Sequence, residues 1–152
     1  MKIIKNLFSK LKILVILFFL IFGTTIAKSN YLDEGIELFK KSEFDKSKIL
    51  FERNLVFNPK SEQSYLYLAK IFNEKKNEQS EETNLNSVLL LNPQNEQALY
   101  MLTLLKIKQS DYDQAKLLIE NFYLVCKSIC SKKSELQEKL EIVTPENAKS
   151  ND

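Results

Sequence analysis

One pattern occurs twice in this chain, and it constrains the fold more than any other feature. Asn58-Pro59 recurs as Asn92-Pro93, and each pair follows an apolar run and precedes Glu-Gln by a short, equal interval. A residue before proline avoids the α region, and proline suits the first turn of a helix, so each pair separates two helices. The period of about 34 residues predicts an array of equivalent helical units rather than an ordinary bundle with accidental spacing.

The residues around these turns resemble the tetratricopeptide repeat, a helix–turn–helix unit of about 34 residues that stacks on copies of itself. Three copies cover about residues 29–129. The resemblance implies that small residues lie where the two helices of a hairpin cross, and the helical spacing of the large apolar residues places them in the hairpin cores. The repeat-signature positions are Tyr31, Gly35, Leu38, Ser47, Phe51, Pro59, Tyr65, Ala69, Phe72, Pro93 and Ala115.

The expected fold is all-α: a right-handed α-solenoid of about three tetratricopeptide hairpins plus a C-terminal capping helix, preceded by a signal-peptide or anchor helix. Apolar residues at helical spacing place the capping helix over Lys133–Val143, with a polar outer face that keeps the array end soluble. The expected ranges are 1–27 for the leader, 28–61, 62–95 and 96–129 for the repeats, 130–144 for the cap and 145–152 for a disordered tail.

Two positions depart from the family pattern. Glu81 stands where a small buried residue is expected, so we predict that the second hairpin opens or shifts there and that the polar segment 74–83 is a solvated turn. Phe122 is large where the pattern has a small residue, which suits an array end against which a final helix packs. Inside the hairpins, Ser42 and Asp111 are predicted to begin capping boxes.

The first 27 residues resemble a secretory signal peptide. Four lysines without an acidic residue precede ten consecutive apolar residues, Ile13–Phe22, and small residues follow up to Ala27. The apolar stretch is shorter than the roughly 20 residues of a membrane-spanning helix. We therefore expect cleavage after Ala27 and export, most readily to a bacterial periplasm. The alternative is an uncleaved anchor in the inner membrane, which would be the only membrane contact.

Charge and composition disfavour several classes of function. Without residues 1–27 the chain has 18 basic and 20 acidic residues, a net charge of −2, whereas nucleic-acid binders present a basic face. An RNA-binding helical-hairpin array, and any nucleic-acid partner, are therefore not expected. The chain has no histidine, which removes Ser-His-Asp triads and histidine-bearing zinc sites. We expect no enzymatic activity, no cofactor and no metal.

The two cysteines, Cys126 and Cys130, stand close together at the junction between the last repeat and the cap. In an exported chain the default state is a disulfide. A regular helix makes this bond difficult, so the chain must reverse direction between them. Two free buried thiols, or redox or metal chemistry, are the alternative interpretations.

The resemblance also implies a binding face. In tetratricopeptide arrays the first helices of the hairpins line a concave groove that holds an extended peptide or a partner helix. The groove transferred to this chain includes Leu32, Ile36, Phe39 and Ile107, and its candidate partner-binding residues are Leu66, Tyr67, Lys70, Asn73, Tyr100, Met101, Leu104 and Lys108. The family's clamp for C-terminal carboxylates is absent, because the matching positions hold Leu32, Ile36, Tyr67, Gln97 and Met101.

The leading functional interpretation is a non-enzymatic, exported adaptor that binds a protein or peptide partner in the bacterial cell envelope. The alternative is a structural subunit of an envelope assembly whose groove is permanently filled by a partner or by a second copy, since monomers rarely expose large apolar patches. The second interpretation includes a homo-oligomer.

Overall fold

The structure is a computed structural model that describes residues 30–143. The leader predicted for 1–27 and the tail predicted for 145–152 lie outside the described residues. Within them every regular element is a helix, and none is long and apolar enough to cross a membrane. The elements are α2 (Tyr31–Lys40), α3 (Phe44–Phe57), α4 (Glu62–Glu74), α5 (Glu78–Leu91), α6 (Glu96–Lys108), α7 (Tyr112–Val125), the short 3-10 helix η1 (Cys130–Lys132) and α8 (Lys133–Val143).

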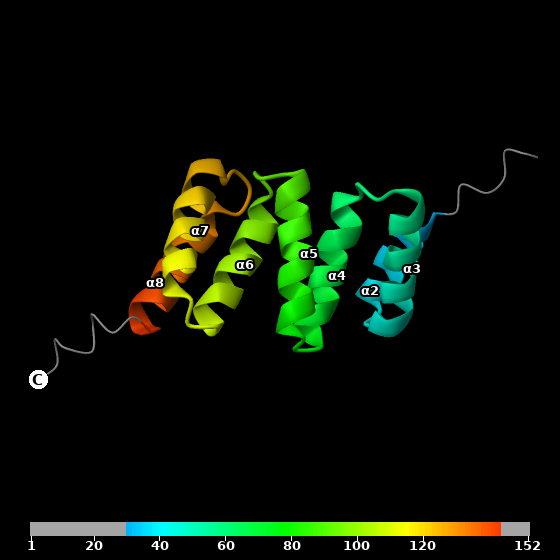
Figure 1. The fold of residues 1–152 in the computed structure, drawn as a ribbon, viewed down its shortest axis with the longest axis horizontal. Helices are drawn as coiled ribbons and strands as arrows, with labels where there is room; N and C mark the ends of the chain where they lie inside the picture. The colour runs from blue at the N-terminus through cyan, green and yellow to red at the C-terminus, as the bar shows by residue number, and fades with distance from the viewer. Residues whose placement is uncertain (1–29, 144–152) are drawn as a thin grey trace, which may run out of the picture. The chain divides into compact units, whose positions relative to one another are not determined.

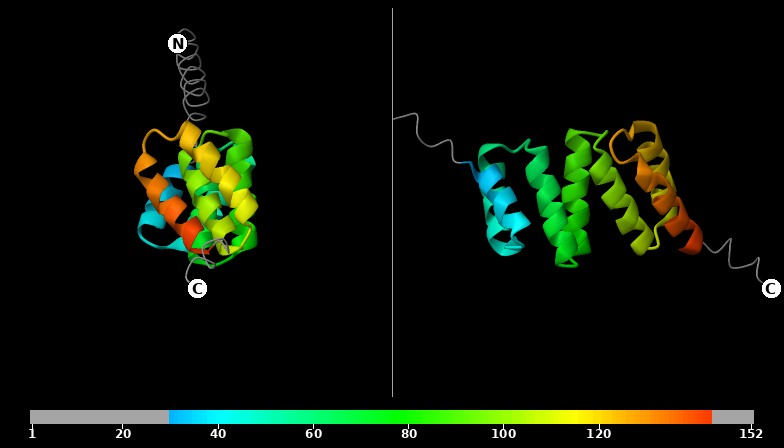
Figure 2. Two further views of the ribbon diagram at one scale, coloured as in Figure 1. Left: turned by 90° about the vertical axis from the view of Figure 1, so that its left-hand side faces the viewer. Right: turned by 180° about the vertical axis from the view of Figure 1, so that it is seen from behind.

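The helices pack as three hairpins followed by a cap. The pairs α2–α3, α4–α5 and α6–α7 form the hairpins, α3 packs on α4, and α5 packs on α6. Figure 1 shows the hairpins following one another in chain order and ending at α8, and the reverse view in Figure 2 shows the same succession of hairpins. The all-α hairpin array predicted from the repeat spacing is confirmed. The three hairpins fall within the ranges 28–61, 62–95 and 96–129.

Gly35 shows why a small residue is needed at a hairpin crossing. A Cβ atom built on Gly35 would lie 2.8 Å from Cε1 of Phe51, a side chain with no exposed surface. The hydroxyl of Ser47 donates a 2.8 Å hydrogen bond to the Gly35 carbonyl, so a side chain of α3 bonds directly to the backbone of α2 at this point. Ala115 and Ala69, the corresponding small residues of later hairpins, are also fully buried.

The turns inside the hairpins repeat as regularly as the helices. Ser42, Lys76 and Ser110 occupy the same position in successive hairpins, and all have positive φ angles, 59°, 55° and 60°. In each turn the next residue donates its N–H to the carbonyl five residues back, as Glu43 does to Leu38 at 2.9 Å. This is the Schellman geometry of a helix end. The predicted capping box at Ser42 is therefore wrong, because Ser42 ends α2 rather than beginning α3.

The N-cap half of the capping box predicted at Asp111 is confirmed, since its carboxylate accepts a hydrogen bond from the Gln114 N–H at 3.3 Å. The Asp111 N–H donates to the Lys106 carbonyl instead of completing the box with the Gln114 side chain. The turn predicted over 74–83 is wrong. Only residues 75–77 separate α4 from α5, because the Asn77 side chain accepts from the Ser80 N–H at 3.0 Å and starts α5 there.

Glu81 is buried inside the second hairpin without opening it. Glu81 is only 2 % exposed, yet α4 and α5 pack closely along their length. The amide of Asn73, on α4, donates a 3.0 Å hydrogen bond to Oε1 of Glu81, which compensates part of the carboxylate's desolvation. The prediction that the hairpin opens or shifts is wrong because a partner on the facing helix accommodates the larger side chain.

The array ends in the predicted cap. Helix α8 has the bounds expected from the sequence and packs on both α6 and α7. Phe122, Leu136 and Leu140 are buried together at this interface, as the bulk of Phe122 indicated. Cys126 follows the end of α7, the chain reverses, and a disulfide joins it to Cys130 with a Cα–Cα distance of 5.3 Å.

Candidate partner-binding face

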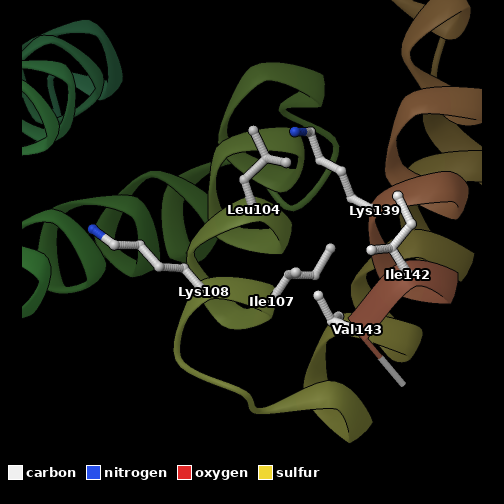
Figure 3. A pocket seen from close by; sticks show the side chains of 6 residues that line it. All are labelled: Leu104, Ile107, Lys108, Lys139, Ile142 and Val143. Atoms are coloured by element: carbon white, nitrogen blue, oxygen red, sulfur yellow. The ribbon is translucent and has the colours of Figure 1, made fainter. Parts of the chain in front are cut away.

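Two hollows lie on the side of the array formed by α4, α6 and α8, which we call the first-helix face. The larger, the α6–α8 pocket, has a volume of about 450 Å³. Figure 3 shows that its apolar walls come from two helices, with Lys139 at one edge and Lys108 extending away from α8. It is lined by Leu104, Ile107, Lys108, Lys139, Ile142 and Val143.

The smaller hollow, the Glu81 pocket, lies between α4, α5 and α6 and has a volume of about 250 Å³. It is lined by Asn73, Glu81, Tyr100, Met101, Leu104, Leu105 and Lys108. Leu104 and Lys108 line both pockets, so the two hollows adjoin along α6. Mostly apolar walls with a few converging polar groups are typical of a binding site.

The charged groups around the Glu81 pocket differ in burial and in their partners. Burial raises the pKa of Glu81, and the hydrogen bond from Asn73 partly opposes that rise. The ammonium of Lys108 forms an ion pair with Oε1 of Glu78 at 2.8 Å, and this contact lowers the pKa of Glu78 and raises that of Lys108. The pocket therefore combines a buried carboxylate with a lysine that is already paired with another carboxylate.

Three of the predicted binding residues lie elsewhere. Leu66 is in the core and only 8 % exposed. The ring of Tyr67 stacks on Phe51 at a centroid distance of 5.0 Å and meets the edge of Phe39 at 5.1 Å. Lys70 lies over the Tyr67 ring at 4.7 Å, and burial lowers the pKa of its ammonium. Tyr67, with Lys70 over its ring, joins the first two hairpins, whereas Leu66 packs in the core between the second and third. None of the three lines either pocket described above.

Tyr100 has two contacts that the sequence did not indicate. Its hydroxyl donates a 2.8 Å hydrogen bond to Oε1 of Glu135, at the start of α8, and Lys132 lies 5.5 Å from the ring centroid. Burial is the main cause of its raised pKa, followed by Glu135. Tyr100 therefore ties α6 to the cap while it also lines the Glu81 pocket.

The structure brings five predicted residues together in the Glu81 pocket: Asn73, Tyr100, Met101, Leu104 and Lys108. Sequence reasoning missed Glu81 as a functional residue, although its polarity at a small-residue position was a signal. It also missed Lys139, Ile142 and Val143, because the sequence does not show that α8 stands beside α6 as the first helix of a further repeat would.

A second exposed surface was also missed. Val56, Leu90 and Leu124 occupy equivalent positions in successive repeats, near the ends of α3, α5 and α7, and they are 77 %, 85 % and 83 % exposed. We call these three residues the apolar ladder. Their equal spacing in the sequence was the available signal, and their position on the second helices of the hairpins separates them from both pockets.

Comparison with known proteins supports the fold. No protein-family model and no curated protein matches the chain. Among solved structures, the first TPR of Spaghetti (RPAP3), bound to the HSP90 peptide SRMEEVD, is similar with a TM-score of 0.66 and 15% identity over 74% of this chain and 89% of that one.

Two further structures are similar. The Sgt2 TPR domain from Aspergillus fumigatus matches with a TM-score of 0.62 and 16% identity over 73% of this chain and 77% of its own. The CopN–Scc3 complex contains a chain that matches with a TM-score of 0.62 and 14% identity, over 78% of this chain and 72% of that one. Together with the hairpin geometry, these matches define the class of protein: an all-α repeat array. More specifically, the chain has the tetratricopeptide-repeat fold.

Proposed function

We propose that this protein is a non-enzymatic adaptor that binds a segment of a partner protein on its first-helix face. The observation that carries the proposal is the pair of adjoining, mostly apolar pockets along α6. The similar structures add support, because one is bound to an HSP90 peptide and another is a complex of two proteins. The two pockets would hold consecutive side chains of one bound segment.

We also propose that the adaptor is exported and acts in a bacterial cell envelope, as a periplasmic protein or on an uncleaved anchor. The leader pattern supports export. The disulfide between Cys126 and Cys130 is consistent with it, since disulfides form and persist in oxidising compartments.

A second candidate function is that of a structural subunit whose apolar surface is permanently covered by a partner or a second copy. The apolar ladder favours this candidate, because three large side chains with more than three quarters of their surface exposed recur once per hairpin. The ladder lies away from the pockets, so the two candidates predict contacts on different surfaces.

Photocrosslinking at single positions distinguishes the two candidates. A photoreactive phenylalanine analogue is placed at one position in each of three variants. The first replaces Lys108, which lines both pockets, and the second replaces Leu90 in the ladder. The third replaces the exposed Glu120 on α7 and is the control. The crosslinked peptide is identified by mass spectrometry after irradiation of cells. We expect Lys108 to crosslink to one defined segment of another protein, and Leu90 and Glu120 not to do so. Crosslinks from Leu90 alone, to a partner or to a second copy, would favour the structural subunit.

A further inference from the structure

We propose that the Glu81 pocket receives a lysine or arginine side chain of the bound partner segment. This assignment rests on the proposed adaptor function and specifies the chemistry of its partner. The pocket offers apolar walls at Tyr100, Met101 and Leu104 and a carboxylate from Glu81. Lysine and arginine have the matching construction, an apolar stem that ends in a cationic group.

The hydrogen bonds of Glu81 leave one oxygen available. Oε1 accepts from Asn73 at 3.0 Å, whereas Oε2 accepts from none of the residues that the structure describes. Among the described residues, every fully buried side-chain oxygen has a hydrogen-bond partner. Because Oε2 has none, it must retain some solvent-accessible surface. Since Glu81 lines the pocket, we take Oε2 as the oxygen that faces it. A cationic donor there would form a charge-assisted hydrogen bond, which is stronger than a neutral one.

The neighbouring charges favour a cation. Lys108 is the one basic residue that lines the Glu81 pocket within the described part of the chain, and its ammonium is held by Glu78 at 2.8 Å. With both carboxyls ionised, Glu78, Glu81 and Lys108 together have a net charge of −1, so an acidic side chain entering the pocket would meet a like charge. An apolar side chain would cover Oε2 of Glu81 without giving it a donor, and covering a charged oxygen in this way is unfavourable.

The raised pKa of Glu81 agrees with this arrangement. Burial disfavours the ionised form in the empty pocket, with Glu78 adding a small like-charge contribution and Asn73 and Lys108 opposing both. A bound cation would reverse the balance and favour ionisation.

Methionine-selective NMR tests the proposal directly. The chain has two methionines, so a sample of the full-length chain labelled with ¹³C at the methionine methyls gives one signal from Met101, in the pocket, and one from Met1. The probes are blocked pentapeptides, acetyl-Ala-Leu-Xaa-Leu-Ala-amide, in which Xaa is arginine, lysine, norleucine or glutamate. Each peptide is titrated at low ionic strength, where charge pairs are least screened.

We expect the arginine and lysine peptides to shift the Met101 signal and to bind at least about tenfold more tightly than the norleucine and glutamate peptides. Glu81→Gln should weaken the arginine peptide about tenfold and should not weaken the norleucine peptide. The glutamine retains an oxygen that accepts from Asn73, so the fold is preserved, as circular dichroism would verify. Glu120→Gln, an equal change of charge at an exposed site on α7, should change neither affinity.

If the arginine and norleucine peptides both shift the Met101 signal and bind with equal affinity, the assignment of a cation to the pocket is overturned. The pocket would then still be a binding site. A preference for glutamate, or arginine binding that survives Glu81→Gln, would overturn it as well. Binding of no peptide would also reject the cation pocket, and the crosslinking from Lys108, which does not depend on charge, would then decide the adaptor function separately.

Discussion

The Ile129 N–H donates a 3.0 Å hydrogen bond to the carboxylate of Glu96, which begins the first helix of the third hairpin. Ser128 donates to the same carboxylate at 2.9 Å. One repeat earlier, Glu62 accepts from the side chain of Asn92 at 3.1 Å. In both repeats a glutamate at the start of the first helix holds the turn at the repeat's end. The repeated Glu-Gln of the sequence thus has a structural role that its spacing alone did not indicate.

Glu96 should make stability depend on pH. The backbone N–H groups, that of Ile129 foremost, lower its pKa from the ordinary value of 4.5. A carboxyl with a lowered folded-state pKa stabilises the fold above its unfolded value and loses that contribution as the pH falls through the folded one. Glu96→Gln should therefore be less stable than wild type in urea at neutral pH and nearly equal to it in strong acid. Glu120→Gln is the control, and a stability gap unchanged between the two conditions would contradict the assignment.

Gly35→Leu should destabilise the first hairpin. Its side chain would overlap the buried ring of Phe51, and overpacking of this kind costs about 1–3 kcal/mol. Thermal melts followed by circular dichroism should show a lower Tm, whereas Glu34→Leu, at the exposed neighbouring position, should have little effect. An unchanged Tm for Gly35→Leu would show that α2 and α3 do not cross at Gly35.

Lys76→Gly should stabilise the protein. Lys76 has a φ of 55°, a conformation that costs a residue with a Cβ atom about 1 kcal/mol and glycine almost nothing. Chemical denaturation should show a gain of about that size. Lys75→Gly is the control, because Lys75 has a negative φ of −82° and pairs with Asp45, so its replacement should not raise stability. A loss of stability for Lys76→Gly would argue against the left-handed turn.

The disulfide should be present in the protein isolated from its native cells. Thiol labelling of the denatured, non-reduced chain should detect no free thiol, and reduction should add two hydrogens to its mass. Replacing Cys126 and Cys130 by serine should lower stability by about 2 kcal/mol, the chain-entropy value for so short a loop. Two cysteines that label freely before reduction would show that the bond does not form in the cell.

The hairpin array could be predicted from the sequence because each hairpin depends on residues close together in the chain. Gly35, Ser47 and Phe51 lie within half a repeat of one another, and the same spacing recurs in the next repeat. The turns inside the hairpins were harder to predict from the sequence. Ser42, Lys76 and Ser110 share a left-handed conformation without sharing a residue type, so composition gave no glycine to mark it.

The candidate binding face was less predictable because it depends on contacts between helices. Tyr67 was assigned to the groove, yet it stacks on Phe51 of the preceding hairpin. Tyr100 also contacts Glu135 of the cap, so its truncation would disturb packing as well as binding. The buried state of Glu81 required Asn73 on the facing helix. In each case the partner comes from another helix, and a periodic pattern records only the residue's own position.

Isothermal titration of the partner segment identified by crosslinking tests the adaptor function most directly, with two matched variants. Ile142→Asp alters the α6–α8 pocket at a side chain that is 73 % exposed, and Leu90→Asp alters the ladder at one that is 85 % exposed. We predict that Ile142→Asp raises Kd about 30-fold, equivalent to about 2 kcal/mol, and that Leu90→Asp leaves it within about twofold. Loss of binding in Leu90→Asp with unchanged binding in Ile142→Asp would contradict recognition on the first-helix face.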